Sequence, residues 1–241
     1  MQLDLTMGQP LLFSIMDKAC FDYGMIEKGD KILVGASGGK DSTALIEYFS
    51  NRLKRKSSSF TFEALYIQSE FAPPMNASLL SLFEKWGVKL NVLEINVQGR
   101  LKEGEKMSCY WCSTQRRKEL LDFAVKNGFN KIALGHHLDD ILETVLMNAL
   151  GKGILEGMPP VLSYKKWPVT IIRPLCYSSQ DVIVEHSLSR GYKCYTCTCL
   201  FQDNSARKDA RKRIEDLTDG DRNKKEKLFK ALKSVCSEYL P

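Results

Sequence analysis

Short apolar runs alternate with longer segments of helical periodicity along most of this chain. Residues 31–36, 62–67, 90–95, 131–135 and 169–175 have the length and the apolar character of buried strands. Apolar side chains recur at helical spacing in the segments 43–53, 77–86, 114–126, 138–150 and 180–190. Because strands that alternate with helices form parallel sheets, the pattern predicts a doubly wound α/β fold, with a mostly parallel sheet covered on both faces.

Two segments fall outside this alternation. Residues 151–166 are rich in glycine and proline, which predicts a loop. The residues that follow Cys199 are basic and polar, and they predict a tail of one or two helices packed outside the sheet.

The composition is that of a globular protein. With 241 residues, of which 44% are hydrophobic and 27% are charged, the chain can bury one full core. Residues 1–10 lack the pattern of a signal peptide, and no apolar run approaches membrane-spanning length. We therefore expect a cytoplasmic protein without a membrane anchor. Eight cysteines in that compartment favour thiols, metal ligands or catalysis over disulfides.

The net charge of +6 is modest, but the positive charges are clustered. A single basic run is most often a solvated helix face, whereas several runs in a small protein favour a polyanionic partner such as a nucleic acid. The runs lie in residues 52–56, 116–118, 207–213 and 222–227.

The segment Ser-Gly-Gly-Lys-Asp-Ser at residues 37–42 lies between a predicted strand and a predicted helix. Adjacent glycines let a backbone approach a ligand closely, and a helix N-terminus offers free N–H groups to an anion. Lys40 adds a positive charge. The spacing excludes a Walker A loop, since Gly35 and Gly39 enclose three residues and Asp41 follows the lysine. The segment therefore predicts another kind of phosphate-binding loop.

In this context the segment resembles the PP-loop of the N-type ATP pyrophosphatases, which cleave ATP between its α- and β-phosphates. The resemblance implies an enzyme that adenylates an oxygen atom and releases pyrophosphate. The residues implied to bind ATP and its Mg²⁺ ion here are Ser37, Gly38, Gly39, Lys40, Asp41 and Ser42.

A second motif, Gly-His-His-Leu-Asp-Asp at residues 135–140, also lies at a predicted strand end and helix start. Acidic residues in a first helical turn usually interact only with the helix dipole. However, both motifs follow strands of one parallel sheet, so we expect them at the same sheet edge. The motif is similar to a signature of PP-loop tRNA thiolases, which implies that Gly135, His136 and Asp140 contribute to the nucleotide site.

The cysteines form two clusters. Cys109 and Cys112 belong to the segment Cys-Tyr-Trp-Cys-Ser, and the second cluster contains Cys194, Cys197 and Cys199. If both clusters share one metal, two kinds of site are open. Four thiolates, from Cys109, Cys112, Cys194 and Cys197, would close a structural zinc site. Three thiolates would instead hold an iron–sulfur cluster with one open iron.

These cysteine motifs resemble those of the enzymes that make 2-thiocytidine in tRNA. That family has Cys-x-x-Cys-Ser before two arginines, here Arg116 and Arg117, and a later pattern similar to residues 199–207. The resemblance implies a [4Fe–4S] cluster on Cys109, Cys112 and Cys199, with Cys194 or Cys197 as alternatives to the third ligand. Either Tyr110 or Trp111 is expected to stack on an unpaired base, unless both pack in the core.

The implied activity is ATP-dependent thiolation of tRNA, through adenylation of a cytidine C2 oxygen and formation of AMP and pyrophosphate. The implied partners are tRNA and a sulfur donor, either a cysteine desulfurase or free sulfide, and a homodimer is possible. Residues 1–200 would form the PP-loop domain with its iron–sulfur site, and residues 201–241 a basic helical extension on it. The alternatives are a PP-loop ligase or amidotransferase with structural zinc, and a nucleotide-binding metalloprotein without sulfur chemistry. The implied catalytic residues are Lys40, Asp41 and Asp140.

Overall fold

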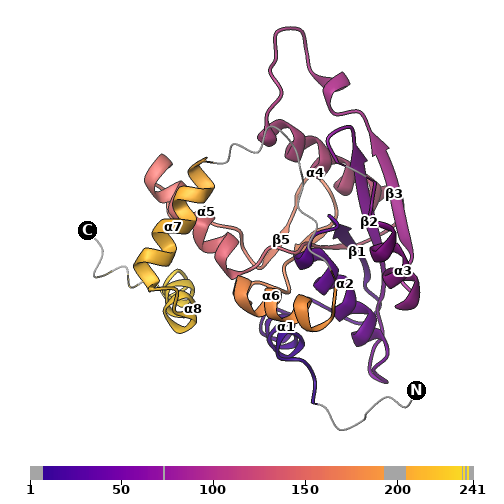
Figure 1. Cartoon of the computed structure of the whole chain (residues 1–241), viewed down its shortest axis with the longest axis horizontal. Coiled ribbons are helices and arrows are strands. Elements are labelled where there is room, and N and C mark those ends of the chain that lie inside the picture. Colours follow the sequence, from indigo (N-terminus) through magenta and orange to yellow (C-terminus); the bar gives the residue numbers. More distant parts are fainter. Residues whose placement is uncertain (1–7, 73, 193–204, 235, 237, 239–241) are drawn as a thin grey trace.

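A computed structural model describes residues 8–72, 74–192, 205–234, 236 and 238, which contain one six-stranded sheet flanked by helices (Figure 1). The strands are ordered β3-β2-β1-β4-β6-β5, and all neighbouring pairs are parallel except β5 and β6. The predicted doubly wound, mostly parallel sheet is confirmed. The strands are β1 (Lys31–Ala36), β2 (Thr61–Ser69), β3 (Leu90–Ile95), β4 (Lys131–Ala133), β5 (Val161–Ser163) and β6 (Thr170–Ile172).

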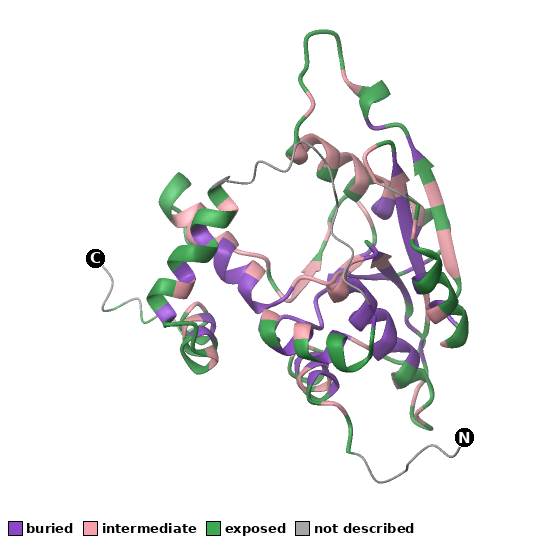
Figure 2. Ribbon diagram, in the orientation of Figure 1, coloured by how far each residue is buried: buried purple, intermediate pink, exposed green. Residues whose placement is uncertain are grey.

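Helices cover both faces of the sheet. They are α1 (Leu11–Asp22), α2 (Lys40–Leu53), α3 (Ala77–Lys85), α4 (Cys109–Lys126), α5 (Leu138–Lys152), α6 (Gln180–Ser189), α7 (Ser205–Thr218) and α8 (Arg222–Ala231), with a 3-10 turn at Gln98–Arg100. Ile32 and Val34 of β1 pack with α1, α2 and α6, whereas Leu33 packs with α4. Successive strand residues therefore enter opposite cores, and the central strands are purple in Figure 2.

Three elements differ from the sequence prediction. The segment 151–166, predicted as a loop, contains β5, so this prediction was wrong. Val161 of β5 pairs with Ile172 at the edge of the sheet, and this long-range pairing makes the strand. Helix α1 was not predicted. Helix α4 begins at Cys109 instead of residue 114, because the Ser108 hydroxyl caps it by accepting a hydrogen bond from the Trp111 N–H at 3.1 Å.

The predicted basic tail is helical, and its two helices pack on α5, outside the sheet (Figure 1). Ile214 of α7 and Phe229 of α8 are buried and join the core on the α2 side of the sheet. In the part of the chain that the structure describes, no helix has the length and apolar character needed to cross a membrane.

Candidate functional site

Residues 37–42 form the tight turn after β1 and the start of α2. Gly38 has a φ angle of +80°, a region that favours glycine. The Ser42 hydroxyl closes the turn, since it accepts a hydrogen bond from the Ser37 N–H at 3.1 Å and donates one to the Gly39 carbonyl at 3.1 Å. Helix α2 begins at Lys40, so its positive dipole end lies at the loop.

Lys40 and Asp41 form an ion pair on this loop. The Lys40 Nζ lies 2.8 Å from Asp41 Oδ1 and 3.1 Å from Oδ2, and the two side chains are 16% and 29% exposed. The pair holds one cation and one carboxylate beside the helix N-terminus. A phosphate group can attract the cation, and a metal ion can attract the carboxylate.

The second motif contacts the first one directly. A Cβ atom on Gly135 would lie 3.2 Å from both the Asp41 carbonyl carbon and the Ser42 nitrogen. These neighbours are backbone atoms at the start of α2, so a side chain at this position would push the loop away. Glycine therefore allows the two motifs to meet at one sheet edge, as the sequence predicted.

The two histidines of the second motif have opposite charge preferences. Burial, followed by the charge of Arg173, lowers the pKa of His136 to about 4, so this ring is neutral at pH 7. Burial also disfavours the charged form of His137, but the carboxylates of Asp139, Asp140 and Asp41 outweigh it and raise the pKa of this histidine. The motif therefore combines an uncharged ring with a ring held among carboxylates.

Basic residues of the tail bind the acidic residues of α5. The Lys225 Nζ donates to Asp139 Oδ1 at 2.9 Å, and both residues are buried. Arg207 Nη1 donates to Asp140 Oδ1 at 3.1 Å, while Asp140 Oδ2 accepts from the His137 N–H at 3.1 Å. Two basic side chains of the tail therefore lock the second motif in place.

A cavity of about 240 Å³ opens beside the PP-loop. Arg116 and Arg117 of α4 line it, and neither arginine has an ion-pair partner among the described residues. The apolar side chains suit the nucleobase ring of a nucleotide, and the arginines suit the phosphates of the same nucleotide. The other lining residues are Gly35, Ala36, Ser37, Leu65, Ile67, Ser113, Leu120, Leu134 and His136.

Cys109 and Cys112 lie one turn apart at the start of α4, so they share a face of the helix and are half-buried. A helix N-terminus favours thiolates, the form that binds metals. The proposed third ligand, Cys199, and its alternatives Cys194 and Cys197 lie outside the described residues. Within the described ranges, no three side chains of the metal-binding types gather into one site.

The remaining described cysteines are poor candidates for ligands. Cys20 and Cys176 are buried, and burial raises the pKa of the Cys20 thiol to about 11 and that of Cys176 further. Of the two neighbouring aromatic residues, Tyr110 is 81% exposed, whereas Trp111 packs into the core on the α4 side. Tyr110 is therefore the ring that remains accessible to a base.

Comparisons with known proteins identify the family of this chain. Residues 14–214 match the family described as a PP-loop domain. The tRNA-cytidine(32) 2-sulfurtransferase of Yersinia enterocolitica is 33% identical over 99% of this chain and 78% of its own length. The enzyme of that name from a Marinomonas species is 32% identical over 99% of this chain and 87% of its own length.

Two solved structures show a similar fold. The U34-tRNA thiolase NcsA from Methanococcus maripaludis, solved with its [4Fe-4S] cluster, has a TM-score of 0.77 and 18% identity, over 95% of this chain and 80% of that one. An NMN synthetase from Francisella tularensis has a TM-score of 0.56 and 14% identity, over 87% of this chain and 83% of that one. From the family match and the sequence relatives, the chain belongs to the PP-loop enzymes, in the group of the tRNA-cytidine(32) 2-sulfurtransferases.

Proposed function

We propose that this chain thiolates a cytidine of tRNA at C2 in an ATP-dependent reaction. The observation that carries the proposal is the direct contact between the PP-loop and Gly135. This contact joins a phosphate-binding loop to a neutral histidine, and two arginines without ion-pair partners among the described residues line the adjoining cavity. Membership in the sulfurtransferase group supports tRNA as the substrate.

The first step is adenylation of the cytidine. Its C2 oxygen attacks the α-phosphorus of ATP, a new oxygen–phosphorus bond forms, and the bond to the bridging oxygen breaks so that pyrophosphate leaves. Lys40 and the N–H groups at the start of α2 bind the departing phosphates. Asp41 and Asp140 are the residues that would hold Mg²⁺, although both Asp140 oxygens also have protein partners.

The second step replaces oxygen with sulfur. A sulfur nucleophile adds to C2, and the carbon–oxygen bond then breaks with AMP as the leaving group, which is far better than oxide. When bound by Cys109, Cys112 and a third cysteine, a [4Fe–4S] cluster supplies an open iron at which sulfur can be held. Ser113, the residue after Cys112, lines the cavity. The helical turn that carries Cys109 and Cys112 therefore adjoins this cavity.

Analysis of both products tests this function. Anaerobic protein incubated with ATP, sulfide and unmodified tRNA is expected to form 2-thiocytidine and an equal amount of AMP, as measured by nucleoside mass spectrometry and nucleotide chromatography. The control omits sulfide and should yield no thionucleoside. Formation of ADP, or AMP without any sulfur in the tRNA, would contradict the assignment.

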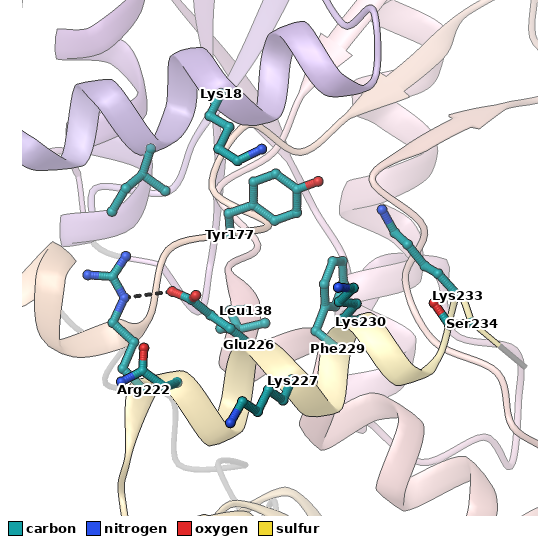
Figure 3. Close-up of a pocket in the computed structure, with 12 residues that line it drawn as sticks. Lys18, Leu138, Tyr177, Arg222, Glu226, Lys227, Phe229, Lys230, Lys233 and Ser234 are labelled. Atoms are coloured by element: carbon teal, nitrogen blue, oxygen red, sulfur yellow. Dashed lines mark hydrogen bonds and ion pairs between the residues drawn. The ribbon is translucent and has the colours of Figure 1, made fainter.

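A second cavity, lined in part by Leu138 of the second motif, supports contact with RNA beside the catalytic edge. Its volume is about 720 Å³, and it lies between α1, α8 and Tyr177, which follows β6 (Figure 3). The rings of Tyr177 and Phe229 lie 5.9 Å apart, and the Lys233 Nζ lies 5.4 Å from the Phe229 ring. Cations around aromatic rings suit an RNA backbone with an unpaired base. The cations that line this cavity are Lys18, Arg222, Lys227, Lys230 and Lys233.

Charge reversal on α8 tests this contact. The double variant Lys227→Glu/Lys230→Glu is expected to weaken tRNA binding at least about tenfold at ~0.1 M salt, and to reduce the salt dependence by about one unit of slope per lysine. Fluorescence anisotropy at several salt concentrations measures both effects. The control is Lys85→Glu/Lys126→Glu, at the C-terminal ends of α3 and α4 and therefore at the opposite sheet edge. Equal losses in both variants would contradict a specific surface.

A further inference from the structure

Arg173 is a buried cation without a carboxylate partner among the described residues. It is 6% exposed, and its Nη1 donates to the Pro159 carbonyl at 2.5 Å. Its Nε is buried without a hydrogen-bond partner in the described part of the chain. A buried guanidinium without a counter-charge is costly to fold, so such a group is expected to bind an anion in the working protein.

The fold holds Arg173 at the edge of the sheet that carries both motifs. Arg173 follows β6, and its N–H donates to the Pro160 carbonyl at 2.9 Å. Ile172 pairs with Ala133 of β4, and the Leu134 N–H donates to the Ile172 carbonyl at 3.0 Å. Since Leu134 leads into the second motif, Arg173 lies beside the strand end that carries His136.

Arg173, Arg117 and His136 lie close enough at this edge for their charges to shift pKa values within the group. Burial, with a further contribution from Arg117, lowers the pKa of Arg173 to about 10. Burial is the largest cause that lowers the pKa of His136, and the charge of Arg173 is the second. The charge of Arg117 also lowers this pKa. The Nδ1 atom of His136 is also buried without a hydrogen-bond partner among the described residues. The edge therefore has two mutually repelling cations and a neutral ring with an unsatisfied nitrogen.

The carboxylates of α5 do not supply the missing charge, because cations of the tail already bind them. Lys225 binds Asp139, and Arg207 binds Asp140. Arg211 binds the next acidic residue of the helix, Glu143, with its Nε 2.6 Å from the carboxylate. Helices α7 and α8 thus neutralise the acidic first turns of α5, and the positive charges of Arg117 and Arg173 have no ion-pair partner in the described part of the chain.

We propose that Arg173, together with Arg117 and His136, forms a binding site for a phosphoryl group. The phosphate supplies the counter-charge and accepts a hydrogen bond from Arg173 Nε, which has no partner among the described residues. Two sources offer this chemistry: the α-phosphate of ATP and a backbone phosphate of the RNA. The choice of ATP and RNA as sources rests on the proposed function. The anion site itself rests on the buried charge of Arg173 and on its Nε, which has no partner among the described residues.

The variant Arg173→Met separates this role from a structural one. It removes the charge but keeps an unbranched side chain, so the melting temperature in anion-free buffer is expected to be unchanged or higher. The matched control is Arg52→Met, since Arg52 is a paired arginine that donates to Asp17 at 2.7 Å and to the Tyr48 hydroxyl at 2.5 Å. This control is expected to lower the melting temperature without changing the affinity for AMP or pyrophosphate.

Calorimetric affinities for AMP, pyrophosphate and tRNA identify the source of the phosphate. If the α-phosphate binds here, Arg173→Met weakens AMP binding at least about tenfold, leaves pyrophosphate binding unchanged, and Arg173→Lys restores part of the loss. If an RNA phosphate binds here, tRNA affinity falls instead. Unchanged affinities for both AMP and tRNA, with a lower melting temperature, would overturn the proposal. These measurements need no turnover, so they remain valid even if no thiolated product forms.

Discussion

Replacing Lys40 with alanine is expected to lower the rate of ATP-dependent turnover by about 10²–10³-fold, a loss typical of removing one group that stabilises developing charge. Lys40 lies at the first turn of α2 and pairs only with the adjacent Asp41 among the described residues. Without it, the Asp41 carboxylate would face the incoming phosphates with no counter-charge. Formation of AMP and pyrophosphate over time, measured with saturating tRNA, reports the effect.

A matched substitution shows that the loss arises at the loop. Lys85→Ala removes an exposed lysine at the last turn of α3, and its turnover is expected to equal that of the unmodified protein. Thermal unfolding should be similar for both variants, because Lys40 is outside the hydrophobic core. A Lys40→Ala variant with normal turnover would show that the loop does not act on the phosphates.

Replacing Cys109 or Cys112 with serine is expected to abolish retention of an iron–sulfur cluster and, with it, thiolation. Anaerobically prepared protein should be brown and contain roughly four irons per chain, as this cluster type requires. Each serine variant should be colourless. Iron–sulfur clusters need soft thiolate ligands, and a serine hydroxyl in place of either thiol on α4 is not a soft ligand. Iron and sulfide analysis with visible absorption measures the change.

Other cysteines provide the controls for this experiment. Cys236 is exposed, so Cys236→Ala is expected to keep both the colour and the activity. Single serine variants of Cys194, Cys197 and Cys199 identify the third ligand, with Cys199 expected to be required. Fully active protein with stoichiometric zinc and no iron would exclude the cluster and favour a structural zinc site.

Local signals explain which parts of the site were predictable. The turn at Gly38 and the close approach at Gly135 both require glycine, and each follows an apolar strand that the hydrophobic pattern reveals. The start of α4 was missed because its first turn, Cys109–Cys112, consists of cysteines and aromatic residues and shows no apolar helical periodicity. Ser108 extends the helix to Cys109, because its hydroxyl accepts from the Trp111 N–H and its carbonyl accepts from the Cys112 N–H.

The sequence by itself determined the parallel sheet, the two motifs at its edge and the family, because strand alternation and motif spacing are properties of neighbouring residues. Only the tertiary structure decided which charges are paired. Lys225 and Asp139 are 86 residues apart, and Arg211 and Glu143 are 68 apart, yet each pair is in contact. The fold brings such partners together, so it also decided that the basic tail neutralises α5 and that Arg173 is a buried cation without a counter-charge among the described residues.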